Sequence, residues 1–92
     1  MEVKVKKEVV VSDAVREISI VNQNEVFAKR LSTLLDEKHI SYGVFGLMIE
    51  TDKSKPYAWC KGKYLPNLTS FMKICLALNV SADFLLFGKE NE

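Results

Sequence analysis

The sequence has few of the residues that build metal centres and disulfide frameworks. Its 92 residues include two cysteines, Cys60 and Cys75, and one histidine, His39, and no two of these three are close in sequence. A structural zinc site needs about four such ligands, so we expect no bound metal and no other cofactor. Isolated thiols are typical of a reducing compartment, which predicts a cytoplasmic protein in which both cysteines are inert packing or surface residues. Oxidation sensing at Cys60 is the alternative.

Long apolar runs are absent as well. The run from Val9 to Val11 is far shorter than the roughly 7 to 15 apolar residues of a signal peptide. Nothing approaches the ~20 apolar residues of a membrane span. No nucleophile and base pair, phosphate-binding glycine loop or metal motif occurs, so we expect no enzyme. A chain of this length buries one modest core, which predicts a single small globular domain.

Net charge gives no indication of a partner, because it is only +1. The charges are nevertheless unevenly distributed. The segment from Lys53 to Lys63 carries four lysines and no acid, whereas the segment from Asp83 to Glu92 carries three acids and one lysine. Most charge runs are solvated helix faces, and that interpretation stays open here. The alternative is that the basic segment meets an anionic partner.

Residues 1–22 form a segment with the pattern of β-strands. Valines and isoleucines alternate with polar residues or cluster in short runs, and Ser12 with Asp13 supplies a turn or cap. Bare strand edges are unstable alone. We therefore interpret residues 1–22 as an N-terminal arm that forms a strand or hairpin and pairs with the same arm of a second copy. This interpretation predicts a homodimer. The alternative is that the arm lies across its own helices.

From Asn22 onward the apolar residues follow the period of a helix, as Phe27, Leu31, Leu34 and Leu35 do. The pattern predicts an all-α domain over residues 23–88. Five helices are expected. The first should start at Asn22 or Asn24, the second at Ser41, the third at Ser54 or Lys55, the fourth at Pro66 with Asn67, and the fifth at Ser81. Gly88 should end the last helix, and residues 89–92 should be a frayed tail.

Many residues from Phe27 to Gly88 fit a known pattern, most densely the stretch Trp59, Gly62, Lys63 and Pro66, which reads W-x-x-G-K-x-x-P. The other matches are Phe27, Arg30, Leu31, Ser41, Phe45, Gly46, Leu68, Phe71, Ile74, Leu78, Val80, Ser81, Asp83, Leu85, Leu86 and Gly88. On these residues the chain resembles the lambda-repressor-like, or Xre-type, helix-turn-helix family. The resemblance covers about two thirds of the 92 residues.

The resemblance implies a five-helix helix-turn-helix domain that binds double-stranded DNA in a sequence-specific manner and regulates transcription, most often as a repressor of phage, mobile-element or autoregulatory type. It places the third helix, near residues 54–61, on the DNA. The residues expected to contact DNA are Tyr42, Lys53, Ser54, Lys55, Tyr57, Ala58, Lys61 and Lys63. Tyr42 replaces a phosphate-binding glutamine of many relatives. Tyr57 can equally be a partly buried packing residue.

Three positions depart from the family pattern. Glu50 stands where a turn glycine is usual, Thr51 where an apolar residue is usual, and Pro56 where a buried isoleucine or valine is usual. Proline is tolerated only in the first turn of a helix, so the third helix should begin at Ser54 or Lys55. These departures keep a second hypothesis open. The chain can be a protein-interaction module, adaptor-like or antitoxin-like, that retains the fold.

Three residues have predicted packing roles in this pattern. Gly46 should lie where the second helix comes close to the third. Trp59 should be buried in the core. Gly62 should take a positive φ angle and end the third helix. Together these roles predict how the third helix is held against the rest of the domain.

Overall fold

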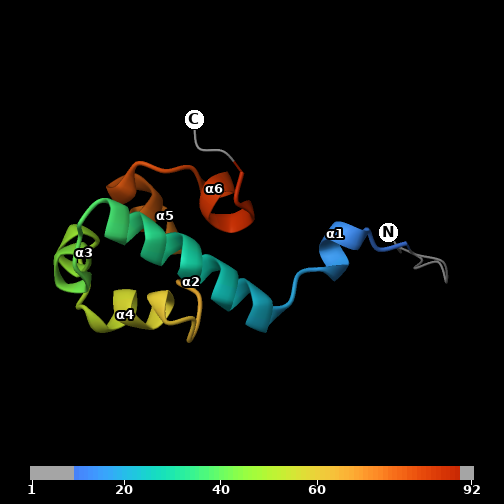
Figure 1. The fold of residues 1–92 in the computed structure, drawn as a ribbon, viewed down its shortest axis with the longest axis horizontal. Helices are drawn as coiled ribbons and strands as arrows, with labels where there is room; N and C mark the ends of the chain where they lie inside the picture. The colour runs from blue at the N-terminus through green and yellow to red at the C-terminus, as the bar shows by residue number, and fades with distance from the viewer. Residues whose placement is uncertain (1–9, 90–92) are drawn as a thin grey trace, which may run out of the picture.

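The computed structural model describes residues 10–89, apart from the side chains of residues 20 and 21. Within that range every regular element is a helix, and six helices follow one another along the chain (Figure 1). Their bounds are α1 Asp13–Arg16, α2 Ile20–Glu37, α3 Tyr42–Met48, α4 Ser54–Cys60, α5 Leu68–Leu78 and α6 Ala82–Phe87. The prediction of an all-α fold is confirmed for the described residues. The described residues hold one helix more than predicted, and the additional helix is α1.

The described part of the N-terminal arm is helical where strands were predicted. The Ser12 hydroxyl accepts a hydrogen bond from the backbone N–H of Val15 at 3.3 Å and caps α1. The Ser19 hydroxyl accepts one from the N–H of Asn22 at 3.2 Å, so α2 begins at Ile20 and neither predicted asparagine is its cap. The strand prediction for residues 10–22 was therefore wrong, because serine caps outweigh β-branched composition. Residues 1–9 of the predicted arm lie outside the described residues.

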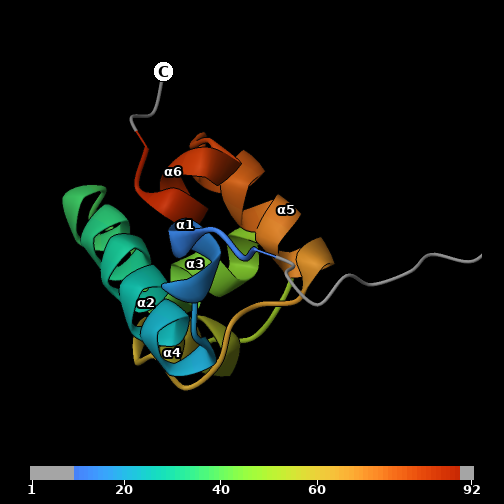
Figure 2. The same cartoon turned by 90° about the vertical axis from the view of Figure 1, so that its right-hand side faces the viewer.

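In Figure 1 helix α2 lies between α4 below and α5 and α6 above, and Figure 2 shows α2 and α5 at opposite sides of the body. Its predicted apolar stripe is buried, and the ring of Phe27 lies 6.1 Å from that of Phe71 on α5, centroid to centroid. The core consists of apolar side chains from five helices and their ends, namely Phe27, Leu31, Leu34, Leu35, Phe45, Ile49, Trp59, Cys60, Phe71, Ile74, Leu78 and Leu85. Helix α1 contributes no buried residue, and its Ala14 and the following Glu17 line an open groove together with Leu86 and Phe87 of α6.

Predicted helix ends are found at α3, α5 and α6. Side-chain oxygens of Ser41, Asn67 and Ser81 each accept a hydrogen bond from the backbone N–H three residues further on, at 3.1, 2.8 and 3.0 Å. Gly62 follows α4 with a φ of 75°, and Gly88 ends α6 with a φ of 71°. These local signals could be predicted because each depends on a residue type and its nearest neighbours.

The connection between α3 and α4 folds back tightly over Gly46. A Cβ atom at Gly46 would lie 2.7 Å from the carbonyl oxygen of Thr51 and 3.1 Å from the carbonyl carbon of Asp52. The Thr51 N–H donates to the Gly46 carbonyl at 2.8 Å. Gly46 therefore does permit a close approach, although to the connecting turn rather than to α4 itself. Glu50 in this turn has a φ of 63°, the left-handed conformation that glycine adopts more easily.

Candidate nucleic-acid interface

Helix α4 has one buried side and one exposed side. Pro56, Ala58, Trp59 and Cys60 are buried, and Trp59 is only 1% exposed, which confirms its predicted place in the core. The other side faces solvent. The exposed residues of α4 and its two ends are Lys53, Ser54, Lys55, Tyr57, Lys61 and Lys63. Six of the eight residues predicted to contact DNA therefore lie at the surface along one helix.

Ala58 lies on the buried side of α4 and not on its exposed side. It is 5% exposed, and its carbonyl accepts a hydrogen bond from the N–H of Lys63 at 3.0 Å. The prediction that Ala58 is exposed was therefore wrong, and the burial of its methyl group disfavours the predicted contact with a thymine methyl. The reason is that the buried side of this short helix is wide, since it takes four of the seven residues.

The start of α4 is organised by Asp52, which was not predicted as a site residue. Its carboxylate accepts hydrogen bonds from the Ser54 hydroxyl and, at 2.9 Å, from the Ser54 backbone N–H. These two hydrogen bonds from Ser54 hold the pKa of the Asp52 carboxyl below its ordinary value. Asp52 is therefore ionised at neutral pH and satisfies an amide in the first turn of α4. The signal in the sequence was an aspartate two residues before a serine at a helix start.

Pro56 occupies the first turn of α4, as predicted. The helix begins at Ser54. The Tyr57 N–H donates to the Lys53 carbonyl at 3.1 Å, which is the i to i−4 hydrogen bond at the start of this helix. Position 56 needs no amide proton there, so the proline ring is accommodated without breaking the helix.

Four of the predicted residues meet around the ring of Tyr57. The ring of Tyr42, from the start of α3, lies edge-on at 5.7 Å between centroids and 88° between planes. The Nζ atoms of Lys61 and Lys63 each lie 5.5 Å from the Tyr57 ring centroid. We call Tyr42, Tyr57, Lys61 and Lys63 the Tyr57 cluster. Because ammonium groups are attracted to an aromatic face, the ring holds two positive charges at one end of α4.

Tyr57 itself is 43% exposed, so it packs in part and remains accessible in part. Its contact with DNA stays a prediction. Its ring packs against that of Tyr42 in a T-shaped pair, and 43% of the residue remains accessible. The ring therefore positions the two lysines and is also available to a partner.

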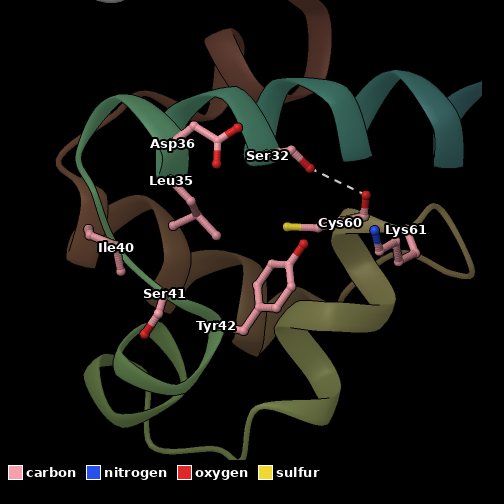
Figure 3. A pocket seen from close by; sticks show the side chains of 8 residues that line it. All are labelled: Ser32, Leu35, Asp36, Ile40, Ser41, Tyr42, Cys60 and Lys61. Atoms are coloured by element: carbon pink, nitrogen blue, oxygen red, sulfur yellow. Dashed lines mark hydrogen bonds between the residues drawn. The ribbon is translucent and has the colours of Figure 1, made fainter.

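A hollow of about 540 Å³ lies beside Tyr42, between α2, α3 and the end of α4. Its lining residues are Ser32, Leu35, Asp36, Ile40, Ser41, Tyr42, Cys60 and Lys61 (Figure 3). The Tyr42 side chain projects into this hollow, with its hydroxyl toward α2 and the end of α4. Ser32 donates a hydrogen bond to the Cys60 carbonyl at 3.3 Å, which ties α2 to the end of α4.

The two cysteines are held as neutral thiols. Burial raises the pKa of the Cys60 thiol, and the nearby Asp36 carboxylate adds to that shift. Burial likewise raises the pKa of the Cys75 thiol. Since the thiolate is the nucleophilic form, this environment disfavours oxidation sensing at Cys60.

No metal centre or membrane span is found within residues 10–89. No group of three or more histidine, cysteine, aspartate or glutamate side chains is placed to hold a metal ion in that range. No helix of the described chain has the length and apolar character to cross a membrane. His39 follows α2 with a φ of 56°, as a helix-end residue.

The chain was compared with models of protein families, with curated proteins and with solved structures, and none of them matches it. The function proposed below is therefore inferred from the residues and their geometry.

Proposed function

We propose that the protein is a sequence-specific double-stranded DNA-binding regulator of transcription, in which α3, the turn over Gly46 and α4 act as a helix-turn-helix. In this proposal α4 enters the major groove and α3 lies across the DNA backbone. Support comes from the family resemblance in the sequence and from the tight α3–α4 connection. A repressor of phage, mobile-element or autoregulatory type is the form of regulator that we propose.

The observation that carries the proposal is the exposed side of α4. Lys53, Ser54 and Lys55 are exposed at its start, and Lys61 and Lys63 lie over the Tyr57 ring at its end. The one carboxylate at this helix, Asp52, is engaged by Ser54. The helix thus offers four positive charges to a polyanion on one side and is fixed to the core on the other.

Each exposed residue has a role in this proposal. Lys53 and Lys55 can donate to the acceptors of guanine in the major groove. The Ser54 hydroxyl donates to Asp52, so it is left to accept from the amino group of adenine or cytosine. Tyr42, Lys61 and Lys63 contact backbone phosphates, which set the register of the helix on the duplex and carry no base information.

The test is selection from random duplex DNA by the purified protein, followed by binding to the selected site over a series of salt concentrations. The proposal predicts an enriched sequence and an affinity that falls steeply with salt, because each neutralised phosphate releases counterions. Folded protein that enriches no sequence contradicts the proposal and favours the protein-interaction module.

A matched pair of variants locates the binding surface. Lys61→Ala should weaken binding and lower the slope of log affinity against log salt by about one, the contribution of one phosphate contact. Lys29→Ala is the control, because Lys29 is exposed on α2 beside Phe84 of α6, away from α4. Equal effects of the two substitutions would show that binding does not use the Tyr57 cluster.

A further inference from the structure

Two hydrogen bonds between Asp52 and Ser54 fix the position of one proton at the start of α4. The Oδ1 atom of Asp52 accepts from the Ser54 backbone N–H at 2.9 Å and also from the Ser54 hydroxyl. The backbone hydrogen bond holds the carboxylate oxygen in place beside the hydroxyl. The side chain of Ser54 therefore has a partner for its only proton within the protein.

The charge of the carboxylate fixes the direction of the hydroxyl hydrogen bond. The hydrogen bonds from Ser54 hold the pKa of the Asp52 carboxyl below its ordinary value, so the group is ionised at neutral pH. An ionised carboxylate has no proton and can only accept. The proton between the two side chains therefore belongs to Ser54, and the serine oxygen keeps its lone pairs for another donor.

A free serine hydroxyl does not distinguish the bases, because it can donate to a carbonyl oxygen or accept from an amino group. In the major groove adenine and cytosine present an amino group, whereas guanine and thymine present a carbonyl oxygen. A serine that only accepts matches the amino group. At a carbonyl oxygen it would place two acceptors against each other. The hydrogen bond to Asp52 thus gives Ser54 a base preference that a free serine does not have.

The two lysines beside Ser54 have the opposite hydrogen-bonding capacity. The Lys53 side chain does not cap α4, and neither Lys53 nor Lys55 forms a salt bridge among residues 10–89. All three side chains are exposed. An ammonium group can only donate, so the lysines match carbonyl oxygens and the N7 atom of guanine. The start of α4 therefore presents donors, then an acceptor, then donors on three consecutive residues.

We propose that Asp52 sets part of the base preference of α4 without contacting DNA, by holding Ser54 as an acceptor. Asp52 is a positioning residue in this inference, and Ser54 is the residue that contacts the base. At one position of the bound site the protein selects adenine or cytosine over guanine or thymine. This inference rests on the proposed binding of duplex DNA by α4.

Two other roles of Asp52 lead to different expectations. If Asp52 only satisfies the Ser54 amide and supports the start of α4, its removal changes binding to every sequence by the same factor. If the Asp52 carboxylate itself accepts from cytosine, the base preference depends on Asp52 and not on Ser54. The ratio of affinities for two sites bound by one protein separates these roles, because uniform effects of folding or charge cancel in it.

Binding of the full chain to its selected duplex, and to duplexes in which one base pair at a time is reversed, tests the inference. Reversal exchanges the amino and carbonyl groups at that position. At the position read by Ser54, reversal should weaken wild-type binding at least roughly five-fold, whereas Ser54→Ala should lose less than about two-fold. Asp52→Ala should tolerate the same reversal, because its serine can again donate. Ser54→Thr is the matched control and should keep the wild-type ratio, because it keeps the hydroxyl.

Failure of the inference and failure of the proposed function give different results. If the protein enriches a site, the inference is overturned when Ser54→Ala makes no position tolerant of reversal. It is also overturned when Asp52→Ala keeps the wild-type ratio at the position that Ser54→Ala identifies. Folded wild-type protein that enriches no site contradicts the proposed function, and the inference fails with it. Circular dichroism checks that the variants keep their helices. If Asp52→Ala does not fold, Asp52→Asn replaces it, since its amide keeps a capping oxygen without the charge and should still lower the ratio.

Discussion

Helices α4 and α5 are alike on their inner sides and opposite on their outer sides. Both bury large side chains in one core, Trp59 from α4 and Ile74 from α5. Outside, α4 presents lysines and tyrosine, whereas α5 presents leucine and methionine. The inner sides account for the fold, whereas the outer sides differ in charge and polarity. The outer side of α4 is the surface for which we propose DNA as the partner.

The largest changes in the free energy of unfolding should come from substitutions on the inner sides of α4 and α5, because both sides pack in the same core. Trp59→Ala should lower the free energy of unfolding by roughly 3 to 5 kcal/mol, and Ile74→Ala by roughly 2 to 5 kcal/mol, because each leaves a cavity in the core. Urea denaturation measures both values. Leu68→Ala on the outer side of α5 is the control, and at concentrations where the protein is monomeric it should change stability by less than about 0.5 kcal/mol. A similar loss at all three positions would remove the distinction between inner and outer sides.

The connections that lead into α4 and α5 also differ, and a substitution at Gly46 tests the first of them. The chain enters α4 through a tight turn over Gly46, whereas it enters α5 through residues 64–67, which have no regular secondary structure. Gly46→Ala should lower the free energy of unfolding by about 1 to 3 kcal/mol, because the added methyl group meets the Thr51 carbonyl oxygen.

Gly43→Ala in the same helix is the matched control, because a Cβ there meets nothing within 4 Å. It should raise the free energy of unfolding by about 0.5 to 1 kcal/mol, since alanine is the better helix former. Thermal or urea denaturation that ranks the two variants in the reverse order would contradict the turn geometry.

A smaller effect should be seen at the start of α4, where Asp52 is tied to Ser54. The folded-state pKa of Asp52 lies below its ordinary value of 3.8, so the ionised carboxylate stabilises the fold above pH 3.8. That contribution is lost as pH falls through the folded-state pKa. NMR titration of the Asp52 carboxyl carbon should show a lowered pKa in the wild-type protein, and Ser54→Ala should move it back toward 3.8. An unchanged titration in Ser54→Ala would exclude the serine as the cause.

Local signals in the sequence predicted most of the helices. Ser41 and Ser81 were predicted as caps, Pro66 with Asn67 as the opening of α5, and Gly62 as a residue with a positive φ, because each depends only on neighbours in the chain. Ser19 was missed as a cap, because the isoleucines and valine beside it have the composition of a strand. Helix α1 was missed for a related reason, since a four-residue helix shows too little periodicity to be recognised.

The covered and uncovered sides of a helix were harder to predict. Leu68 fits the helical period of the buried residues of α5, yet it is exposed, and Ala58 was expected at the surface, yet it is buried. Periodicity shows that apolar residues share a side, but it does not show which side another element covers. The meeting of Tyr42 with Tyr57 across two helices could not be derived from spacing at all.

The measurement that tests the central claim most directly is NMR mapping of backbone amides during titration with the selected duplex, at a protein concentration where the oligomeric state does not change. The account predicts large shift changes at Tyr42 and from Lys53 to Lys63, with little change at Leu68, Met72 and Leu76. Shifts concentrated on α5, with α4 unaffected, would contradict it.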